Sequence, residues 1–187
     1  GAGEYVVRIT KNDGTDYTLS STDTKTGLAS VAIKGTIDSI SDLPVTAEHG
    51  FIVEITGAAA TGADDYYVKF VANAGSGFGH GIWQETVAPG ITYLFDATTM
   101  PHVLIRNNDG TFTFQKFTWA GRVAGDATTA PNPSFVGSTI QNVNLFRNRL
   151  VLLADENVIT SAADSYDRFW PESAQTVADS DPIDLSA

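Results

Sequence analysis

A glycine-rich segment is the first candidate in this chain for a site that binds a phosphate or a cofactor. Residues 75–81 are rich in glycine, as in loops that wrap a phosphate, because glycines let backbone amides approach an anion closely. The segment that follows, residues 82–87, reads as a strand and lacks the Gly-Lys-Ser/Thr ending and the helix of such loops. We predict a flexible connection between strands at residues 75–81, and we expect no cofactor.

The three histidines give a weak metal-binding pattern. His49, His80 and His102 lie 31 and 22 positions apart, without the short paired spacing of zinc sites. We interpret them as surface or structural residues and predict no metal site. The chain has no cysteine, which excludes disulfides, thiolate ligands and a cysteine nucleophile. The serines have no Gly-x-Ser-x-Gly context, so a serine hydrolase has little support.

Carboxylates beside tryptophans leave one enzymatic alternative open. Enzymes that cleave glycans place two acids about 5–10 Å apart across one bond, with aromatic side chains nearby. Glu85 lies near Trp83, Asp126 lies near Trp119, and Asp96 lies between these pairs in the sequence. Because the sequence does not fix the separation of these acids, a glycan-binding or glycan-cleaving β-domain stays an alternative function.

Composition describes a packed protein with an excess of acids. The 187 residues are 42% hydrophobic and carry a formal charge of -11. An acidic balance disfavours static binding to nucleic acid, because Lys and Arg supply affinity for phosphates. No apolar run approaches the roughly 20 residues of a membrane span, so we expect no membrane insertion.

The charge is unevenly distributed along the chain. Residues 1–100 carry 5 basic and 12 acidic side chains, residues 101–150 carry 5 and 2, and residues 151–187 carry 1 and 8. A solvated surface with uneven charge is the favoured interpretation. Mutual attraction between the segments is the alternative.

The elements that must position these residues are short β-rich runs separated by turn residues. Residues 4–10 and 15–21 flank Asn-Asp-Gly and predict a hairpin, and residues 102–106 and 111–117 flank a second Asn-Asp-Gly. In the second hairpin Phe112, Phe114 and Lys116 share one face. We expect one face of that hairpin to be core.

Further strands are predicted at residues 51–55, 66–72, 142–146, 149–154 and 158–161. Helical candidates are limited to residues 37–42 and a turn within 162–169. The fold class is therefore predicted as mainly β, with antiparallel hairpins and meanders and one or two short helical turns. An α+β fold is the alternative.

A domain boundary is predicted at residues 125–133, where Gly, Thr and Pro predominate. On this interpretation residues 1–125 form a β-rich domain. Residues 134–187 then begin a second β-rich domain, whose strand spacing suits a propeller blade. The alternative is a long surface loop, with residues 134–187 continuing the first domain.

Seven short segments stand out along the second part of the chain. They are WQET at 83–86, TMPH at 99–102, WAGR at 119–122 with GD at 125–126, PNPSFVG at 131–137, FRNRL at 146–150, FW at 169–170 and DPID at 181–184. In this order and at this spacing, they resemble the tail nozzle protein family of short-tailed (podovirus-type) bacteriophages, also called tail tubular protein B. The resemblance covers about Asp42 to Ala187, and residues 1–41 match only in general style.

The resemblance implies a structural protein of the virion with no enzymatic activity. It implies that six copies form the distal tube of the tail, through which the genome passes during ejection. It also implies that this ring contacts an adaptor-like tail tubular protein and the tail fibres. The family resemblance further implies a longer parent chain built largely of β-structure, of which these residues are a fragment. Under the glycan alternative, the domain acts at the host cell surface.

Arginines in these segments are suited to bracing loops. Arg147 and Arg149 flank a tight connection, and a guanidinium can hold several carbonyls or a carboxylate at fixed angles. We predict that both brace irregular loops, and that Arg122 with Asp126 braces the Trp119 loop. The alternative is exposed arginines whose salt bridges contribute well under ~1 kcal/mol each.

The acidic end of the chain suggests a further hypothesis. A conduit must let DNA slide without trapping it, and a wall poor in Lys and Arg avoids tight phosphate binding. If residues 151–187 face the lumen, their acids repel DNA weakly.

Overall fold

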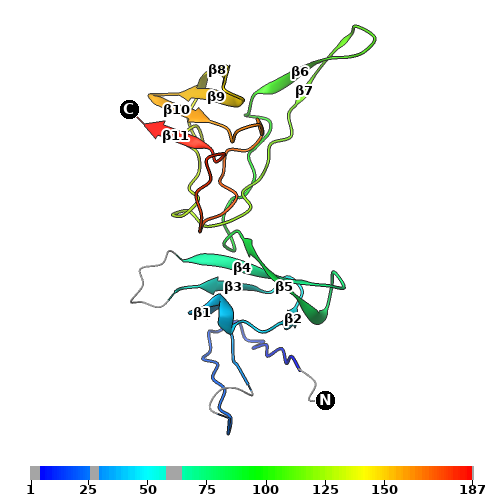
Figure 1. Ribbon diagram of the computed structural model, residues 1–187, viewed down its shortest axis with the longest axis vertical. Coiled ribbons are helices and arrows are strands. Elements are labelled where there is room, and N and C mark those ends of the chain that lie inside the picture. The colour runs from blue at the N-terminus through cyan, green and yellow to red at the C-terminus, as the bar shows by residue number, and fades with distance from the viewer. Residues whose placement is uncertain (1–4, 26–29, 58–64, 187) are drawn as a thin grey trace. The chain divides into compact units, whose positions relative to one another are not determined.

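The chain is mainly β, as predicted. The computed structural model describes residues 5–25, 30–57 and 65–186. The chain divides into two compact units, Gly1–Thr86 and Val87–Ala187, which we name unit 1 and unit 2. The strands of each unit form their own sheets (Figure 1). Each unit also has its own buried apolar side chains. Among the described residues, no helix has the length and apolar character needed to cross a membrane.

Unit 1 is built around a mixed five-stranded sheet with the order β1-β3-β4-β5-β2. β1 and β3 run parallel, and the other neighbours are antiparallel. Alternate residues of β4, Val68, Phe70 and Ala72, are buried, as expected for a strand with one core face. The strands predicted at residues 51–55 and 66–72 are confirmed as β3 and β4. The strands are β1 (Thr36–Ile37), β2 (Thr46–Glu48), β3 (Ile52–Ile55), β4 (Tyr66–Ala72) and β5 (Phe78–Thr86).

The hairpin predicted at residues 4–10 and 15–21 is wrong, because residues 5–21 contain no strand. Its turn does form, with the Thr15 amide donating to Asp13 Oδ1 at 3.0 Å. The flanking apolar residues remain exposed, Tyr5 at 90%. No strand of the described sheets pairs with these residues.

The flexible connection predicted at residues 75–81 is wrong in its second half, because β5 begins at Phe78. Gly81 pairs with Ala72 of β4, where an added Cβ would lie 2.2 Å from the Val71 carbonyl oxygen. This glycine therefore permits a close approach of two strands. The glycine content of residues 75–81 led us to predict a flexible segment. At Gly81, however, the lack of a side chain allows two paired strands to approach closely.

One short helical turn is confirmed. The 3-10 turn η1 (Ile40–Asp42) begins after Ser39, whose side chain accepts a hydrogen bond from the Ser41 amide. It ends at Leu43, before Pro44, so the predicted helix at residues 37–42 is shortened. Residues 162–169 contain turns and an isolated bridge between Ala162 and Ser165.

Unit 2 contains a two-stranded ribbon and a four-stranded antiparallel sheet with the order β11-β10-β9-β8. The second predicted hairpin and the meander are confirmed, whereas the sequence did not predict β11. The strands are β6 (His102–Arg106), β7 (Phe112–Lys116), β8 (Ile140–Phe146), β9 (Arg149–Ala154), β10 (Asn157–Thr160) and β11 (Ile183–Ser186).

The expectation that one face of the second hairpin is core is wrong. All five residues of β7 are exposed, with Phe112 at 62% and Phe114 at 70%. Within unit 2, the ribbon of β6 and β7 extends away from the four-stranded sheet (Figure 1). Its apolar side chains therefore lie on a surface.

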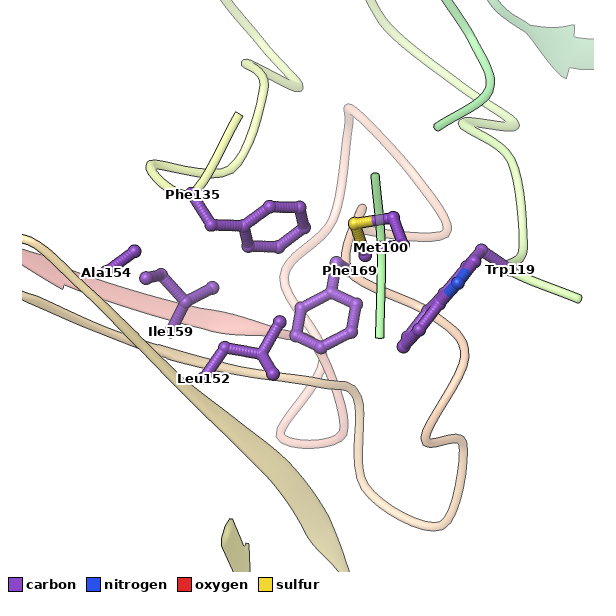
Figure 2. Close-up of a cluster of buried hydrophobic side chains, with 7 residues drawn as sticks. All are labelled: Met100, Trp119, Phe135, Leu152, Ala154, Ile159 and Phe169. Carbon is purple, nitrogen blue, oxygen red and sulfur yellow. The ribbon is translucent and has the colours of Figure 1, made fainter. Parts of the chain in front are cut away.

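The core of unit 2 joins strands to loops. Leu152, Ala154 and Ile159 come from β9 and β10, and the other members come from irregular segments (Figure 2). Phe135 meets Phe169 edge-on, with ring centroids 5.2 Å apart. Because loops supply so much of this core, their backbone must be held by specific contacts. The loop residues in the cluster are Met100, Trp119, Phe135 and Phe169.

The predicted division into residues 1–125 and 134–187 stays a prediction about independent folding. Residues 125–133 lie within unit 2, where Gly125 bridges Val87 and Pro133 is buried. The compact units divide between Thr86 and Val87.

Candidate functional site

Arg149, the first residue of β9, contacts two segments that are distant in sequence. Its Nη1 donates to the carbonyl oxygens of Ser161 at 2.8 Å and Asp181 at 2.6 Å. Its Nη2 donates to the Asp179 carbonyl oxygen at 2.7 Å. One guanidinium thus joins the start of β9 to the end of β10 and to the loop before β11. Charge-assisted hydrogen bonds of this kind are stronger than neutral ones.

The local sequence explains where Arg149 lies. Arg147 and Asn148 both have positive φ, 49° and 58°, and form the two-residue turn between β8 and β9. Such turns match the twist of antiparallel strands, and asparagine tolerates this conformation. The Asn148 carbonyl oxygen also accepts a hydrogen bond from the Asp164 amide at 2.9 Å.

Arg147 lies in a different environment from Arg149. It is exposed, and its guanidinium carbon lies 5.4 Å from the centroid of the Phe146 ring. A cation–π contact at an exposed site contributes about 0.5–1 kcal/mol. The structure therefore gives the two arginines unequal contacts.

Arg122 is buried among loop residues of unit 2. Its Nη2 donates to Asn132 Oδ1 at 2.6 Å, and its guanidinium carbon lies 5.2 Å from the Trp170 ring centroid. Trp170 in turn stacks on Phe95. Burial lowers the pKa of the Arg122 guanidinium, and the charge of Asp126 acts in the opposite direction.

Asp126 caps a turn. Its Oδ1 accepts hydrogen bonds from the amides of Thr128 at 2.7 Å and Thr129 at 2.8 Å. The hydrogen bond from the backbone amide of Thr129 is the main cause that lowers the pKa of Asp126, and the charge of Arg122 contributes least. The preceding Gly125 has φ 74°, and a Cβ there would lie 2.7 Å from Thr129 Oγ1.

Arg122 and Asp126, which we predicted to brace the Trp119 loop together, do not contact each other directly, and the charge of each shifts the pKa of the other. No ion pair between them is found in the part of the chain that the structure describes. Sequence reasoning missed Asn132 and Trp170 as the contacts of Arg122. Both residues lie in segments that carry the family resemblance, PNPSFVG and FW, and this was the available signal.

Sequence reasoning also missed a link between residues 50 positions apart. Asp184 in β11 accepts hydrogen bonds from the Ser134 amide at 2.7 Å and from Ser134 Oγ at 2.8 Å. This double contact ties the loop that carries Phe135 to the edge of the four-stranded sheet. The predicted bracing of loops by Arg122, Asp126, Arg147 and Arg149 concerns the stability of the protein and stays a prediction.

Several aspartates share one structural use. In Asp-x-Thr sequences beginning at Asp13, Asp96 and Asp109, Oδ1 accepts hydrogen bonds from both the amide and the hydroxyl of the threonine. The threonine hydrogen bonds lower the pKa of all three aspartates. These acids stabilise turns.

This geometry weakens the glycan-cleaving alternative. The general acid of a glycosidase needs a raised pKa, whereas the pKa values of Asp96 and Asp126 are lowered. Glu85 lies in unit 1 near Tyr66, whose pKa is raised by burial and by the charge of Glu85. A groove of about 470 Å³ in unit 2 is lined by Phe95, Trp170 and other described residues, of which Asp96 is the one carboxylate.

Each of the three histidines makes a different structural contact. His80 Nδ1 lies 3.1 Å from Thr46 Oγ1, His49 Nδ1 accepts from the Ala72 amide, and His102 stacks on Phe114. Among residues 5–25, 30–57 and 65–186, no group of three or more metal-ligating side chains is present.

The acids of residues 151–187 differ in whether they make contacts within the chain. Asp181 is buried and accepts a hydrogen bond from the Ala178 amide. Glu172 and Asp184 are exposed, although Glu172 pairs with Arg168 and Asp184 accepts hydrogen bonds from Ser134. The exposed acids of this segment include Asp155, Glu156, Asp164 and Asp179.

The ribbon of β6 and β7 presents one face that combines apolar and basic residues. Leu104 pairs with Phe114, Arg106 pairs with Phe112, and His102 pairs with Lys116. Residues paired directly across an antiparallel ribbon point to the same side. We name this surface the ribbon face: His102, Leu104, Arg106, Phe112, Phe114 and Lys116.

Two comparisons with known proteins found matches to this chain. The family described as bacteriophage nozzle protein matches residues 1–187, including residues 1–41, where the motif resemblance was only general. The chain is 37% identical over 187 residues to the tail tubular protein gp12 of Escherichia phage T7. The match covers 98% of this chain and 22% of that protein, so the chain spans about a fifth of its relative's length.

Proposed function

This chain belongs to the bacteriophage nozzle protein family, and from that membership we propose that its parent protein forms a ring-shaped conduit for DNA ejection. The chain is a structural component of the phage tail and hence of the virion. The observation that carries the conduit proposal is the family match over residues 1–187. The proposal concerns the full-length protein, of which this chain is a part.

The ring consists of six copies in this proposal. A ring requires head-to-tail contacts in which two different surfaces of neighbouring copies meet. The ribbon face supports one half of such a contact, because it exposes Leu104, Phe112 and Phe114 beside the cations of Arg106 and Lys116. The chain carries a net charge of -11, so an acidic surface of the next copy complements this face.

The neighbours of the ring are the adaptor-like tail tubular protein and the tail fibres. Family membership supports this assignment, and the T7 relative is itself described as a tail tubular protein.

DNA passes through this ring without lasting contact. The exposed acids of residues 151–187, such as Asp155 and Glu156, support this part of the proposal if they line the lumen. Acids repel phosphates and release no counterions on contact with DNA. A map that placed these acids on the outer wall would contradict it.

The arginines give the loops of unit 2 the rigidity that such a wall requires. Arg149 holds three backbone carbonyls, and Arg122 joins Asn132 to the Trp170 ring. These contacts support the bracing role, which is structural and involves no catalysis. A glycosidase needs two carboxylates across one bond, whereas Asp96 is the one carboxylate among the described residues that line the groove of unit 2, which favours a non-enzymatic protein.

The test uses the purified full-length protein. Its assembled mass is measured by native mass spectrometry, and release of reducing sugar from host capsular or cell-wall polysaccharide is assayed in parallel. We expect six-copy rings and no sugar release. Polysaccharide cleavage that is lost in Glu85→Gln or Asp126→Asn would instead establish the glycan-cleaving alternative.

A further inference from the structure

The groove of unit 2 has apolar walls. Among the residues that line it, Leu94 is 53% exposed and Val136 is 45% exposed. Phe95, Phe135 and Trp170 also line the groove, and the Phe95 ring stacks on Trp170 with ring centroids 3.9 Å apart. Apolar side chains that are exposed together mark an interaction surface more often than scattered ones do. The groove is therefore a candidate for contact with an apolar partner.

The volume of the groove suits aromatic side chains. An apolar cavity of about 150 Å³ holds one benzene molecule, whereas the groove measures about 470 Å³. It therefore has room for two phenyl rings. Three polar side chains of its lining, Asp96, Thr99 and Asn132, already have hydrogen-bond partners within the chain. An apolar occupant is thus favoured over a small polar ligand.

The ribbon face carries two phenyl rings that have no cover within unit 2. Phe112 is 62% exposed and Phe114 is 70% exposed. Both belong to β7 and lie two positions apart on one side of the ribbon, which separates them by about 7 Å along the strand. Because the ribbon extends away from the four-stranded sheet (Figure 1), these rings are presented to another molecule.

Charge adds to this apolar complementarity. Asp96 is exposed, and it is the one carboxylate among the described residues that line the groove. Hydrogen bonds from Thr98 lower its pKa, and the charge of Lys116 in the same chain contributes least to that shift. Arg106 lies opposite Phe112 on the ribbon face and makes no ion pair among the described residues. An incoming ribbon face thus brings a cation to an acidic groove, and such complementarity favours correct pairing.

We propose that the groove of unit 2 receives the ribbon face of a neighbouring copy. Phe112 and Phe114 of that copy pack against the apolar walls, and its Arg106 lies near Asp96. This inference rests on the proposed ring and names the two surfaces that meet in it. The ribbon face and the groove are different surfaces of one unit, so their contact is head-to-tail, as a ring requires.

The test uses cross-linking between copies of the full-length protein. Leu104→Cys on the ribbon face and Val136→Cys in the groove are made as separate variants, and one of them carries a mass tag. Any cysteine outside residues 1–187 is replaced by serine. The two variants are co-expressed and treated with a short bifunctional maleimide. Because no chain carries both cysteines, a product with one copy of each variant reports contact between two chains, and packing within one chain cannot produce it.

The controls keep the fold and change the position of one cysteine. Leu104 and Val136 are exposed, so both variants should fold. Leu94→Cys gives a second groove position. Val177→Cys replaces the groove variant in the control, because Val177 is 97% exposed and lies outside both surfaces. Native mass spectrometry of the same samples, before the maleimide is added, counts the copies in each assembly.

We expect at least about tenfold more mixed product from Leu104→Cys with Val136→Cys than with Val177→Cys, because groups held at an interface react at a raised effective concentration. Six-copy rings without this excess at either groove position would overturn the inference and leave the ring standing. Mixed product from protein that forms pairs and no rings would support the contact and refute the ring. Protein that neither assembles nor cross-links would refute both.

Discussion

At the scale of single residues, two neighbouring arginines have unequal structural weight. Arg149 donates to three backbone carbonyls, whereas Arg147 contacts the Phe146 ring from an exposed position. Removing Arg149 leaves the Ser161 and Asp181 carbonyls without their charged donor. Unpaired buried acceptors cost more than the hydrogen bond itself contributed.

We therefore predict that Arg149→Ala lowers the free energy of unfolding by about 2–4 kcal/mol. Arg149→Lys should recover only part of this loss, because an ammonium lacks the planar fork. The matched control, Arg147→Ala, should cost at most about 1 kcal/mol. Urea unfolding followed by tryptophan fluorescence measures all three, and equal losses for the two alanine variants would contradict the assignment.

Asp126 makes a prediction that depends on pH. Its pKa lies below the ordinary aspartate value of 3.8, chiefly because the backbone amide of Thr129 donates a hydrogen bond to the carboxylate. A group whose pKa is lower in the folded state stabilises the protein above its unfolded pKa, and that stability is lost as the pH falls through the folded value. The folded protein then binds fewer protons than the unfolded chain.

Asp126→Asn keeps an oxygen acceptor but removes the charge. We predict that the wild-type chain is more stable than this variant near neutral pH, and that the difference shrinks as the pH falls below about 4. Asp126→Ala should lose the cap as well, costing about 1 kcal/mol at neutral pH. Unfolding curves collected between pH 7 and pH 2.5 measure this, and a constant difference between wild type and Asp126→Asn would be evidence against it.

The sequence identified Arg149 and Asp126 but could not predict what they contact. The carbonyl partners of Arg149 lie up to 32 positions away, and Asn132 is brought to Arg122 by the path of an irregular loop. Side-chain type predicts the capacity for such contacts. The partners depend on tertiary structure, which local pattern does not encode.

At the scale of elements, the ribbon of β6 and β7 is the clearest surface for assembly. Its strands follow from local signals, since two β-rich runs flank Asn-Asp-Gly. Local signals cannot show whether a partner layer exists, and the ribbon face proved to be exposed. Phe112 and Phe114 are therefore available for contact with a second copy.

We predict that Phe112→Ser combined with Phe114→Ser weakens ring assembly of the full-length protein by at least about tenfold, because buried aromatics dominate interface energetics. Folding should persist, since both side chains are exposed in unit 2. Val177→Ser, at another exposed apolar position outside the ribbon, is the control. Light scattering against protein concentration measures assembly, with circular dichroism to check folding, and unchanged assembly would remove the ribbon face from the ring contact.

The strands that sequence predicted well are those with a buried face or a strong turn. β4 and β9 match their predicted bounds because apolar and β-branched residues continue until a turn begins. Residues 5–21 have the same pattern of β-rich runs around Asn-Asp-Gly as β6 and β7, but they form no strand. A covering layer does not explain this difference, because β7 pairs with β6 although all of its residues are exposed. β11 was missed because its four residues follow a polar segment and pair only with the distant β10.

At the scale of the whole molecule, two divisions of the chain make different predictions. The structure divides into compact units between Thr86 and Val87. The sequence predicts independent domains at residues 1–125 and 134–187. Residues 87–124 distinguish the two, because they belong to unit 2 in the first division and to the first domain in the second.

Hydrogen exchange with mass spectrometry in a core variant tests this point. Val68→Ala in unit 1 should lower stability by about 2 kcal/mol and speed amide exchange in β4. We expect residues 87–124 to exchange at their original rates. Leu152→Ala in unit 2 is the reciprocal control and should speed exchange there. Faster exchange of residues 87–124 in Val68→Ala would favour the division derived from sequence.

The central claim is that this chain is part of a ring in the wall of the phage tail. The most direct measurement is an electron cryo-microscopy map of intact tails from the phage that encodes it, with unit 1 and unit 2 fitted separately. We predict that each unit fits six times around the tail axis, with the ribbon face against a neighbouring copy. A map that placed the units outside the tube wall, or with a different copy number, would contradict this account.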